Sequence, residues 1–219
     1  MERRVKVTGL LACVLVFMLA VGTSYGQLSN AGFENGLTGW STFNLGGGIL
    51  GTGTGASGNL ASGSPHGGLN VLQLYGPFNG QWDAAGAVQN IAVSAGQTLT
   101  LTGYGMDPSG DPMLTTGLGF GEIQIVFRNS GGTGLLTIDS NAIDKSAGNY
   151  DVWQLLTASG VAPATTVSAD IYALHVNGPD YSGGSAYFDD LAVVVPEPSS
   201  IALALAGLLG LTAVIRKRR

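Results

Sequence analysis

QTLTLTGYGM, which runs from Gln97 to Met106, alternates apolar and polar side chains along most of its length. A repeat of two residues is typical of a β-strand that buries one face in a core and turns the other to solvent. A Ser94-Ala95-Gly96 turn precedes the stretch, and a second β-type run, Ala87 to Val93 (AVQNIAV), precedes that turn. The sequence therefore predicts strands around this point.

Short β-type runs recur along the rest of the chain, separated by clusters of Gly, Pro, Asn and Asp. They are Leu69 to Tyr75, Gly121 to Arg128, Gly134 to Asp139, Val152 to Thr157, Thr165 to Val176 and Ala186 to Val195. No long run has helical periodicity, so we expect an all-β antiparallel sandwich. The Gly-, Ser- and Thr-rich stretch from Leu45 to Gly68 is the exception, and we expect a long loop there with at most one poor strand.

Residues 1–26 have the three parts of a secretory signal peptide. These are a cationic start (Arg3, Arg4 and Lys6), an apolar centre (Leu10 to Val21) and small residues (Ser24 and Gly26) before a cleavage point at Gln27. Cleavage there would also remove Cys13, the only cysteine in the chain. The exported domain, residues 27–195, is therefore predicted to have no disulfides, and its stability must come from its core or from a metal.

The chain ends with three features in sequence: Pro196-Glu197-Pro198, an uncharged apolar run from Ile201 to Ile215, and four cations from Arg216 to Arg219. Proline disfavours helix at the first feature. The apolar run predicts a single transmembrane helix, whose terminal cations can reach the bilayer surface. Cations next to such a helix stay in the cytoplasm, so residues 196–219 are predicted to leave the preceding domain outside the cell.

Almost all the positive charge lies in these two terminal segments. Between Gln27 and Val195 only Arg128 and Lys145 are basic, against twelve Asp and Glu residues, which gives a net charge near −10. Such a domain is a poor partner for nucleic acid and for anionic membrane surfaces.

The Pro-Glu-Pro, apolar and basic features together resemble the PEP-CTERM sorting signal of Gram-negative bacteria. The resemblance implies recognition by an exosortase, transit through the inner membrane, and delivery to the cell surface or extracellular matrix. An ordinary C-terminal membrane anchor is the alternative. It explains the apolar run and the cations, but not Pro196, Glu197 and Pro198.

Three stretches resemble the galactose-binding-like jelly-roll modules, which include many carbohydrate-binding modules. They are NAGFENGLTGW (Asn30 to Trp40), QNIAVSAGQTLTLTGY (Gln89 to Tyr104) and YFDDLAVVV (Tyr187 to Val195). The resemblance implies a jelly roll over residues 27–195, in which the first and last strands come together.

The same resemblance implies a structural calcium ion held by Glu34 and by an aspartate of the last strand. Asp189 is the better match, because Asp190 should point to the opposite face of a regular strand. The alternative is that Glu34 caps a turn and both aspartates are solvated. Asp107 and Asp111 flank another turn that could hold calcium, although a solvated turn is favoured there.

A sugar site needs exposed rings beside polar groups, because rings stack on the apolar faces of pyranoses. LYGPFNGQWD (Leu74 to Asp83) offers Tyr75, Phe78, Trp82 and Asp83 among glycines and amides, and NGPDY (Asn177 to Tyr181) offers Tyr181. The alternative is that some of these rings fill the core. We expect Trp40 and Trp153 to be core residues.

An enzyme is less well supported by the sequence. GEIQIVF, which begins at Gly121, is similar to the Glu-x-Asp-x-x-Glu motif of laminarinase-type hydrolases, but Gln124 and Phe127 replace its second and third carboxylates. Retaining glycosidases need two carboxylates. We therefore predict a non-catalytic exported protein that binds extracellular polysaccharide. A structural matrix protein without a ligand is one alternative, and a polysaccharide hydrolase is another.

Overall fold

A computed structural model describes residues 28–45, 49–54, 60–76, 79–181 and 183–195 of the chain. Within these ranges all regular structure is β-strand, which confirms the all-β prediction. No helix long and apolar enough to cross a bilayer occurs among the described residues. The predicted signal peptide, Pro-Glu-Pro motif, transmembrane helix and basic end lie outside these ranges.

Ten strands are present. Their bounds are β1 Ser41–Leu45, β2 Ile49–Thr54, β3 Asn70–Gly76, β4 Asp83–Ala92, β5 Thr98–Met106, β6 Phe120–Asn129, β7 Gly134–Asp139, β8 Gln154–Val161, β9 Thr166–Asn177 and β10 Gly184–Val194. The alternating sequence of Gln97 to Met106 thus forms β5. Inside the predicted loop from Leu45 to Gly68 lies one short strand, β2.

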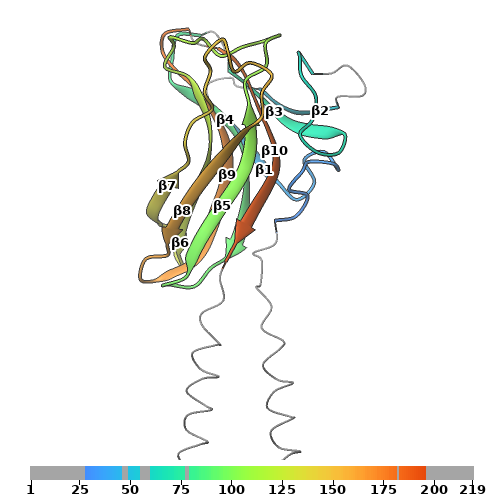
Figure 1. The fold of residues 1–219 in the computed structure, drawn as a ribbon. Helices are drawn as coiled ribbons and strands as arrows, with labels where there is room; N and C mark the ends of the chain where they lie inside the picture. Colours follow the sequence, from blue (N-terminus) through green and yellow to red (C-terminus); the bar gives the residue numbers. More distant parts are fainter. Residues whose placement is uncertain (1–27, 46–48, 55–59, 77–78, 182, 196–219) are drawn as a thin grey trace, which may run out of the picture. The chain divides into compact units, whose positions relative to one another are not determined.

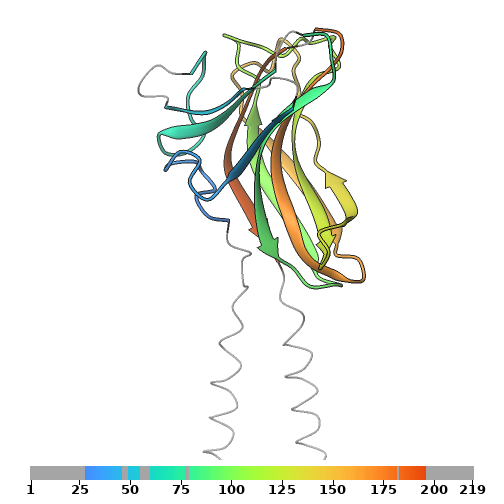
Figure 2. The ribbon, with the colours of Figure 1, turned by 180° about the vertical axis from the view of Figure 1, so that it is seen from behind.

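The strands form two five-stranded antiparallel sheets packed face to face, as in a jelly roll (Figure 1). The first sheet has the order β1-β4-β9-β6-β7, and the second has the order β2-β3-β10-β5-β8. In Figure 2 the first sheet faces the viewer, with β9 in orange. Consecutive strands often belong to different sheets, so most pairs join distant parts of the chain.

The main core lies between the sheets and follows the alternation of the strands. Inward-facing side chains of the first sheet include Ile123, Ile125 and Phe127 on β6 and Ile171 on β9. Those of the second sheet include Leu72, Leu74, Leu99, Leu101 and Phe188, and all of these side chains are fully buried. Apolar burial on this scale is the main stabilising contribution to such a sandwich.

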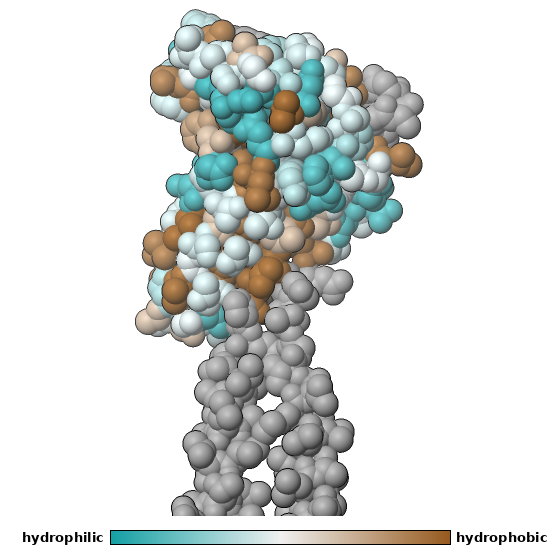
Figure 3. Space-filling model, in the orientation of Figure 1, coloured by the Kyte–Doolittle hydropathy of each residue, from teal (hydrophilic) through white to brown (hydrophobic). Residues whose placement is uncertain are grey.

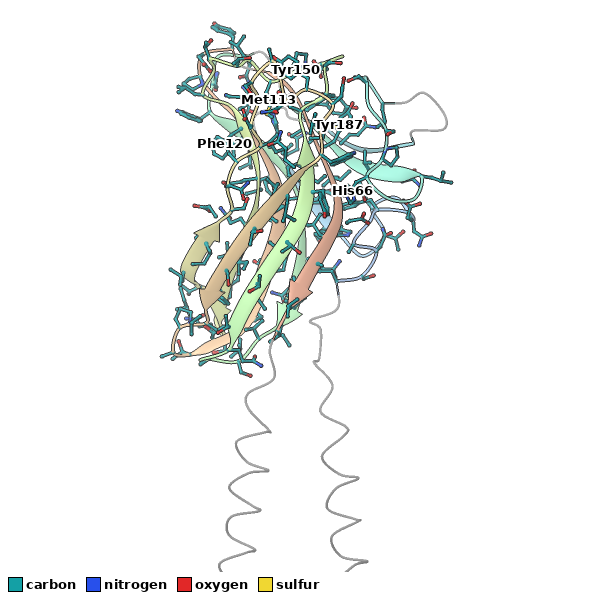
Figure 4. The ribbon with its side chains drawn as sticks, viewed as in Figure 1. His66, Met113, Phe120, Tyr150 and Tyr187 are labelled. Carbon is teal, nitrogen blue, oxygen red and sulfur yellow. The ribbon has the colours of Figure 1, made fainter. Side chains whose placement is uncertain are left out.

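A second, smaller cluster lies on the outward face of the second sheet. It contains Val71, Met106 and Tyr187, with Leu60 and Trp153 packed against them. The backbone N–H of Ala61 donates to the Tyr187 hydroxyl at 2.9 Å, and the Trp153 indole N–H donates to the carbonyl of Ser64 at 2.8 Å. The segment after residue 59 therefore covers part of this face, and Figure 4 labels Tyr187 and His66 there.

The two tryptophans predicted to be in the core differ in burial. Trp40 is buried and packs against Phe33, with ring centroids 5.2 Å apart. Trp153 is only partly buried and precedes β8, so it belongs to the second cluster and not to the space between the sheets.

Candidate ligand-binding site

The two stretches proposed separately as sugar sites lie side by side at one end of the sandwich. β4 begins at Asp83 and β9 ends at Asn177, and these two residues are direct partners in the first sheet. The Asn177 side-chain amide donates to the carbonyl of Gln81 at 3.4 Å. A Cβ atom on Gly80 would lie only 2.7 Å from the Tyr181 ring, so that ring rests against Gly80. Loops 79–83 and 177–181 therefore form one surface.

Of the predicted sugar-contacting side chains that the structure describes, Trp82 and Tyr181 are exposed, with 58% and 63% of their surface accessible. Tyr75 is half-buried on β3, and its hydroxyl donates to the Gln73 side chain. Burial, and then the nearby Asp111, raise the pKa of Tyr75. Phe78 lies outside the described residues. Among the described side chains of this surface, Trp82 and Tyr181 are therefore the exposed aromatic rings.

Asp83 is buried below this surface together with other polar side chains. One of its oxygens accepts a hydrogen bond of 2.8 Å from the Asn79 amide. The other oxygen, Oδ1, has no partner among the described residues, and the same is true of both ring nitrogens of His175 and of Oδ1 of Asn177. Burial, and then the charge of Lys145, lower the pKa of His175 to about 4. The imidazole is therefore neutral at physiological pH.

Three carboxylates predicted as calcium ligands gather around the segment 66–70. Glu34 accepts hydrogen bonds of 3.0 Å from the backbone N–H groups of Leu69 and Asn70. Asp189 accepts bonds of 3.0 Å from the N–H groups of His66 and Gly67. We call this arrangement the carboxylate clamp. It joins the first described turn and the last strand to one loop, because Glu34 and Asp189 both bind backbone N–H groups of segment 66–70.

Asp190 does not point to the opposite face from Asp189, contrary to the expectation for a regular strand. Its carboxylate lies 2.7 Å from Nδ1 of His66, whose backbone N–H binds Asp189. The pairing of β10 with β5 shifts register between Asp189 and Ala192, and Asp190 has a φ of 48°. This β-bulge breaks the alternation on which the expectation depended.

In the clamp as it stands, backbone N–H groups engage the carboxylate oxygens that a calcium ion would need. Calcium takes six to eight oxygen ligands, whereas backbone N–H donors are directed at the oxygens of Glu34 and Asp189. No group of three or more His, Cys, Asp or Glu side chains suited to a metal occurs in the described part of the chain. Structural calcium at Glu34, Asp189 and Asp190 therefore stays a prediction for experiment.

Asp107 is not part of a solvated turn, contrary to the favoured expectation. It is fully buried, and its carboxylate accepts a hydrogen bond of 2.9 Å from the N–H of Met113. Burial raises its pKa to about 6. Asp111 accepts a hydrogen bond from the Ser185 hydroxyl. Asp107 thus binds the backbone of Met113, and Asp111 binds the side chain of Ser185 on β10.

The outward face of the first sheet carries a set of polar and aromatic side chains that the sequence argument did not select. Gln124 donates to Asp139 at 2.7 Å, and the Phe43 and Tyr172 rings meet edge to face at 6.0 Å. Glu122, on the same face of β6, is 8% exposed, and burial followed by the charge of Asp139 raises its pKa to about 7. Glu122 and Gln124 lie two residues apart on β6, so the two-residue repeat of a strand places both side chains on one face. This alternation is the sequence signal that could have predicted the shared face.

The face seen in Figure 3 has apolar residues scattered among polar ones. Exposed apolar side chains interspersed in this way are ordinary on protein surfaces.

Residues 194–219 match the PEP-CTERM protein-sorting motif. This confirms the resemblance drawn from the Pro-Glu-Pro, apolar and basic features, and it indicates a secreted protein that an exosortase sorts to the surface of a Gram-negative bacterium. No curated protein matches the chain in sequence.

Several solved structures share the sandwich fold. A Stig cyclase from Fischerella sp. TAU aligns with a TM-score of 0.57 and 18% identity, over 80% of this chain and 99% of the cyclase. The CBM22-1 xylan-binding domain of Xyn10C from Paenibacillus barcinonensis aligns with a TM-score of 0.51 and 14% identity, over 82% of this chain and 99% of that domain.

The enzymatically active domain of tailspike protein 4 from bacteriophage CBA120 aligns with a TM-score of 0.54 and 17% identity, over 76% of this chain but only 21% of the tailspike chain. Identities this low show a common fold, and the fold serves both binding domains and enzymes.

Proposed function

We propose that the protein is an exported, non-catalytic cell-surface or extracellular-matrix protein that binds extracellular polysaccharide. The observation that carries the proposal is the exposure of Trp82 and Tyr181 on loops that lie side by side. Flat exposed rings stack on the apolar faces of pyranose sugars, and neighbouring amides such as Gln81 can orient the hydroxyl groups. The similarity in fold to a xylan-binding domain and the sorting motif both support this function.

Two aromatic contacts supply only modest affinity, so useful retention on a polymer depends on several contacts in parallel. A polysaccharide offers the same unit many times along its length, and many protein copies on a surface multiply the contacts. The sorting motif would deliver the domain to the place where such polymers accumulate.

The test uses the isolated domain, residues 27–195, because residues 25–195 form a compact unit that contains the whole described core. Affinity electrophoresis in gels that contain neutral and acidic polysaccharides measures retention. Trp82→Ala and Tyr181→Ala should each weaken retention at least ten-fold, as expected for one stacking contact of about 1.5 kcal/mol. Leu155→Ala is the matched control, since Leu155 is 54% exposed on β8, in the other sheet.

Retention that survives both aromatic changes would contradict this binding surface. If Phe43→Ala abolished retention instead, the outward face of the first sheet would be the binding face, because Phe43 belongs to that face. A domain that binds no glycan would favour a structural matrix protein. Release of reducing sugars, lost in Glu122→Gln, would favour a hydrolase.

A further inference from the structure

We propose that Asp83, His175 and Asn177 bind a divalent transition-metal cation of the Zn²⁺ type between the two sheets, beneath loop 79–83. This site is separate from the carboxylate clamp at Glu34, Asp189 and Asp190. It also does not depend on whether the loop above it binds polysaccharide.

The strand register brings the three side chains together on the inner face of the first sheet. Asp83 on β4 is the direct partner of Asn177 on β9, and His175 lies two residues before Asn177. Directly paired residues have Cβ atoms about 4.5–5.5 Å apart, and residues two apart on a strand share a face. All three are at least 95% buried, with exposures of 5%, 1% and 0% for Asp83, His175 and Asn177.

The opposite sheet confirms that two of these groups converge. A Cβ atom added to Gly76 on β3 would lie 2.9 Å from Oδ1 of Asn177 and 3.2 Å from Nδ1 of His175. The oxygen and the nitrogen are therefore no more than about 6 Å apart, and both lie next to the β3 backbone. Only glycine allows this approach, since the same Cβ would lie 2.5 Å from Cε1 of the imidazole.

The atoms in this cluster lack the hydrogen bonds that buried polar atoms normally have. Oδ1 of Asp83, Oδ1 of Asn177 and both ring nitrogens of His175 are buried without a partner among the described residues. Two of them are acceptor oxygens on directly paired residues, and no described donor reaches either one. A single cation bound between these side chains would satisfy both oxygens and a ring nitrogen at once.

The kinds of donor select the kind of metal. Imidazole nitrogen suits zinc and its neighbours among the transition metals, whereas calcium and magnesium prefer oxygen alone. Zinc sites commonly combine nitrogen and carboxylate oxygen. Only two members of the cluster are among His, Cys, Asp and Glu, and the amide oxygen of Asn177 is the third protein donor.

A cation bound at this site would also restrict the position of loop 79–83. The second oxygen of Asp83 accepts from Asn79, and the Asn177 amide donates to the carbonyl of Gln81. A cation would thus tie β4 and β9 together at the point where the loop that carries Trp82 ends and β4 begins.

The experiment exploits the fact that the chain contains two histidines, His66 and His175. The tag-free domain, residues 27–195, is treated with chelator and then titrated with Zn²⁺. Long-range ¹H–¹⁵N spectra of the imidazole rings follow both histidines separately. We expect one equivalent of Zn²⁺ to shift the His175 ring resonances and to raise the melting temperature, whereas Ca²⁺ leaves the His175 ring unchanged.

Variants then assign the ligands. Asp83→Asn should weaken Zn²⁺ binding at least ten-fold, and His175→Gln should abolish the one-equivalent binding. His66→Gln is the matched control, because His66 lies on the outward side of the second sheet beside Asp190, and it should bind Zn²⁺ as the wild type does. Glu34→Gln should likewise leave the Zn²⁺ affinity unchanged.

A titration that leaves His175 unshifted, or shifts only His66, would overturn the proposal and leave buried water as the partner of these polar atoms. Zn²⁺ affinity that is equal in wild type and Asp83→Asn would do the same. The wild-type spectra decide the outcome even if a variant fails to fold.

Discussion

Glu122 should make this domain less stable as the pH rises, and Glu122→Gln should remove that dependence. The pKa of Glu122 is raised from 4.5 to about 7 by burial and then by the charge of Asp139. The folded protein therefore holds this proton more tightly than the unfolded chain does. Stability that is fully present below pH 4.5 is lost as the pH rises to about 7.

The size of the effect follows from the size of the pKa change. A rise from 4.5 to about 7 corresponds to at most roughly 3 kcal/mol at pH 8, because one pKa unit is worth about 1.4 kcal/mol. Residual contact with water reduces this free energy, since 8% of the Glu122 surface remains exposed. We expect Glu122→Gln to raise the free energy of unfolding by about 1–3 kcal/mol at pH 8 and by less than about 0.5 kcal/mol at pH 4.

Urea denaturation of the wild type and Glu122→Gln at pH 4, 5.5, 7 and 8.5 measures this difference. Comparing the two proteins cancels the pH dependence of other buried carboxyl groups, such as Asp107 and Asp189, whose pKa values are both about 6. Asp139→Asn is the matched control and should reproduce only the smaller part of the effect. A difference between wild type and Glu122→Gln that is constant across the pH range would refute the reasoning.

Three further changes test other parts of the structure. Asp189→Ala should lower the free energy of unfolding by about 1–3 kcal/mol, because it leaves the partly buried N–H groups of His66 and Gly67 without their acceptor. A loss below about 0.5 kcal/mol in urea denaturation would show that the loop is held by other contacts. Gly76→Ala should cost about 1–3 kcal/mol, since its Cβ would meet the His175 ring at 2.5 Å, and a melting temperature equal to the wild type would contradict that packing. Ca²⁺ added back after chelation should leave the melting temperature unchanged if N–H groups occupy the carboxylate oxygens of the clamp. A rise in melting temperature that is lost in Glu34→Gln would instead establish the predicted calcium site.

Most strands could be predicted because their sequences alternate or are rich in β-branched and aromatic residues. β7 has the predicted bounds, and β5 begins one residue later than predicted. β1 was missed because its sequence, STFNL, is short and all its side chains are at least partly exposed. β2 (ILGTGT) is the one poor strand allowed for in the stretch from Leu45 to Gly68, where its many glycines gave no signal for its bounds.

The candidate site was predictable in its residue types but not in its arrangement. Aromatic and amide side chains among glycines marked loops 79–83 and 177–181 as separate candidates. Alternation placed Asp190 on the wrong face, because a local bulge reverses the side-chain direction without a mark in the sequence. Glu122 was set aside for lack of a second carboxylate in its own strand, although Asp139 on the neighbouring strand influences its pKa.

By itself the sequence determined the β class of the domain, its low content of basic residues and its C-terminal sorting motif, since these depend on composition and on residues close together in the chain. Only the tertiary structure decided which loops are neighbours and which carboxyl groups are buried. The contact between Asn177 and Gln81 joins residues 96 positions apart. It depends on the pairing of β4 with β9, which local propensity does not specify, because a strand can pair with any partner that buries the same face.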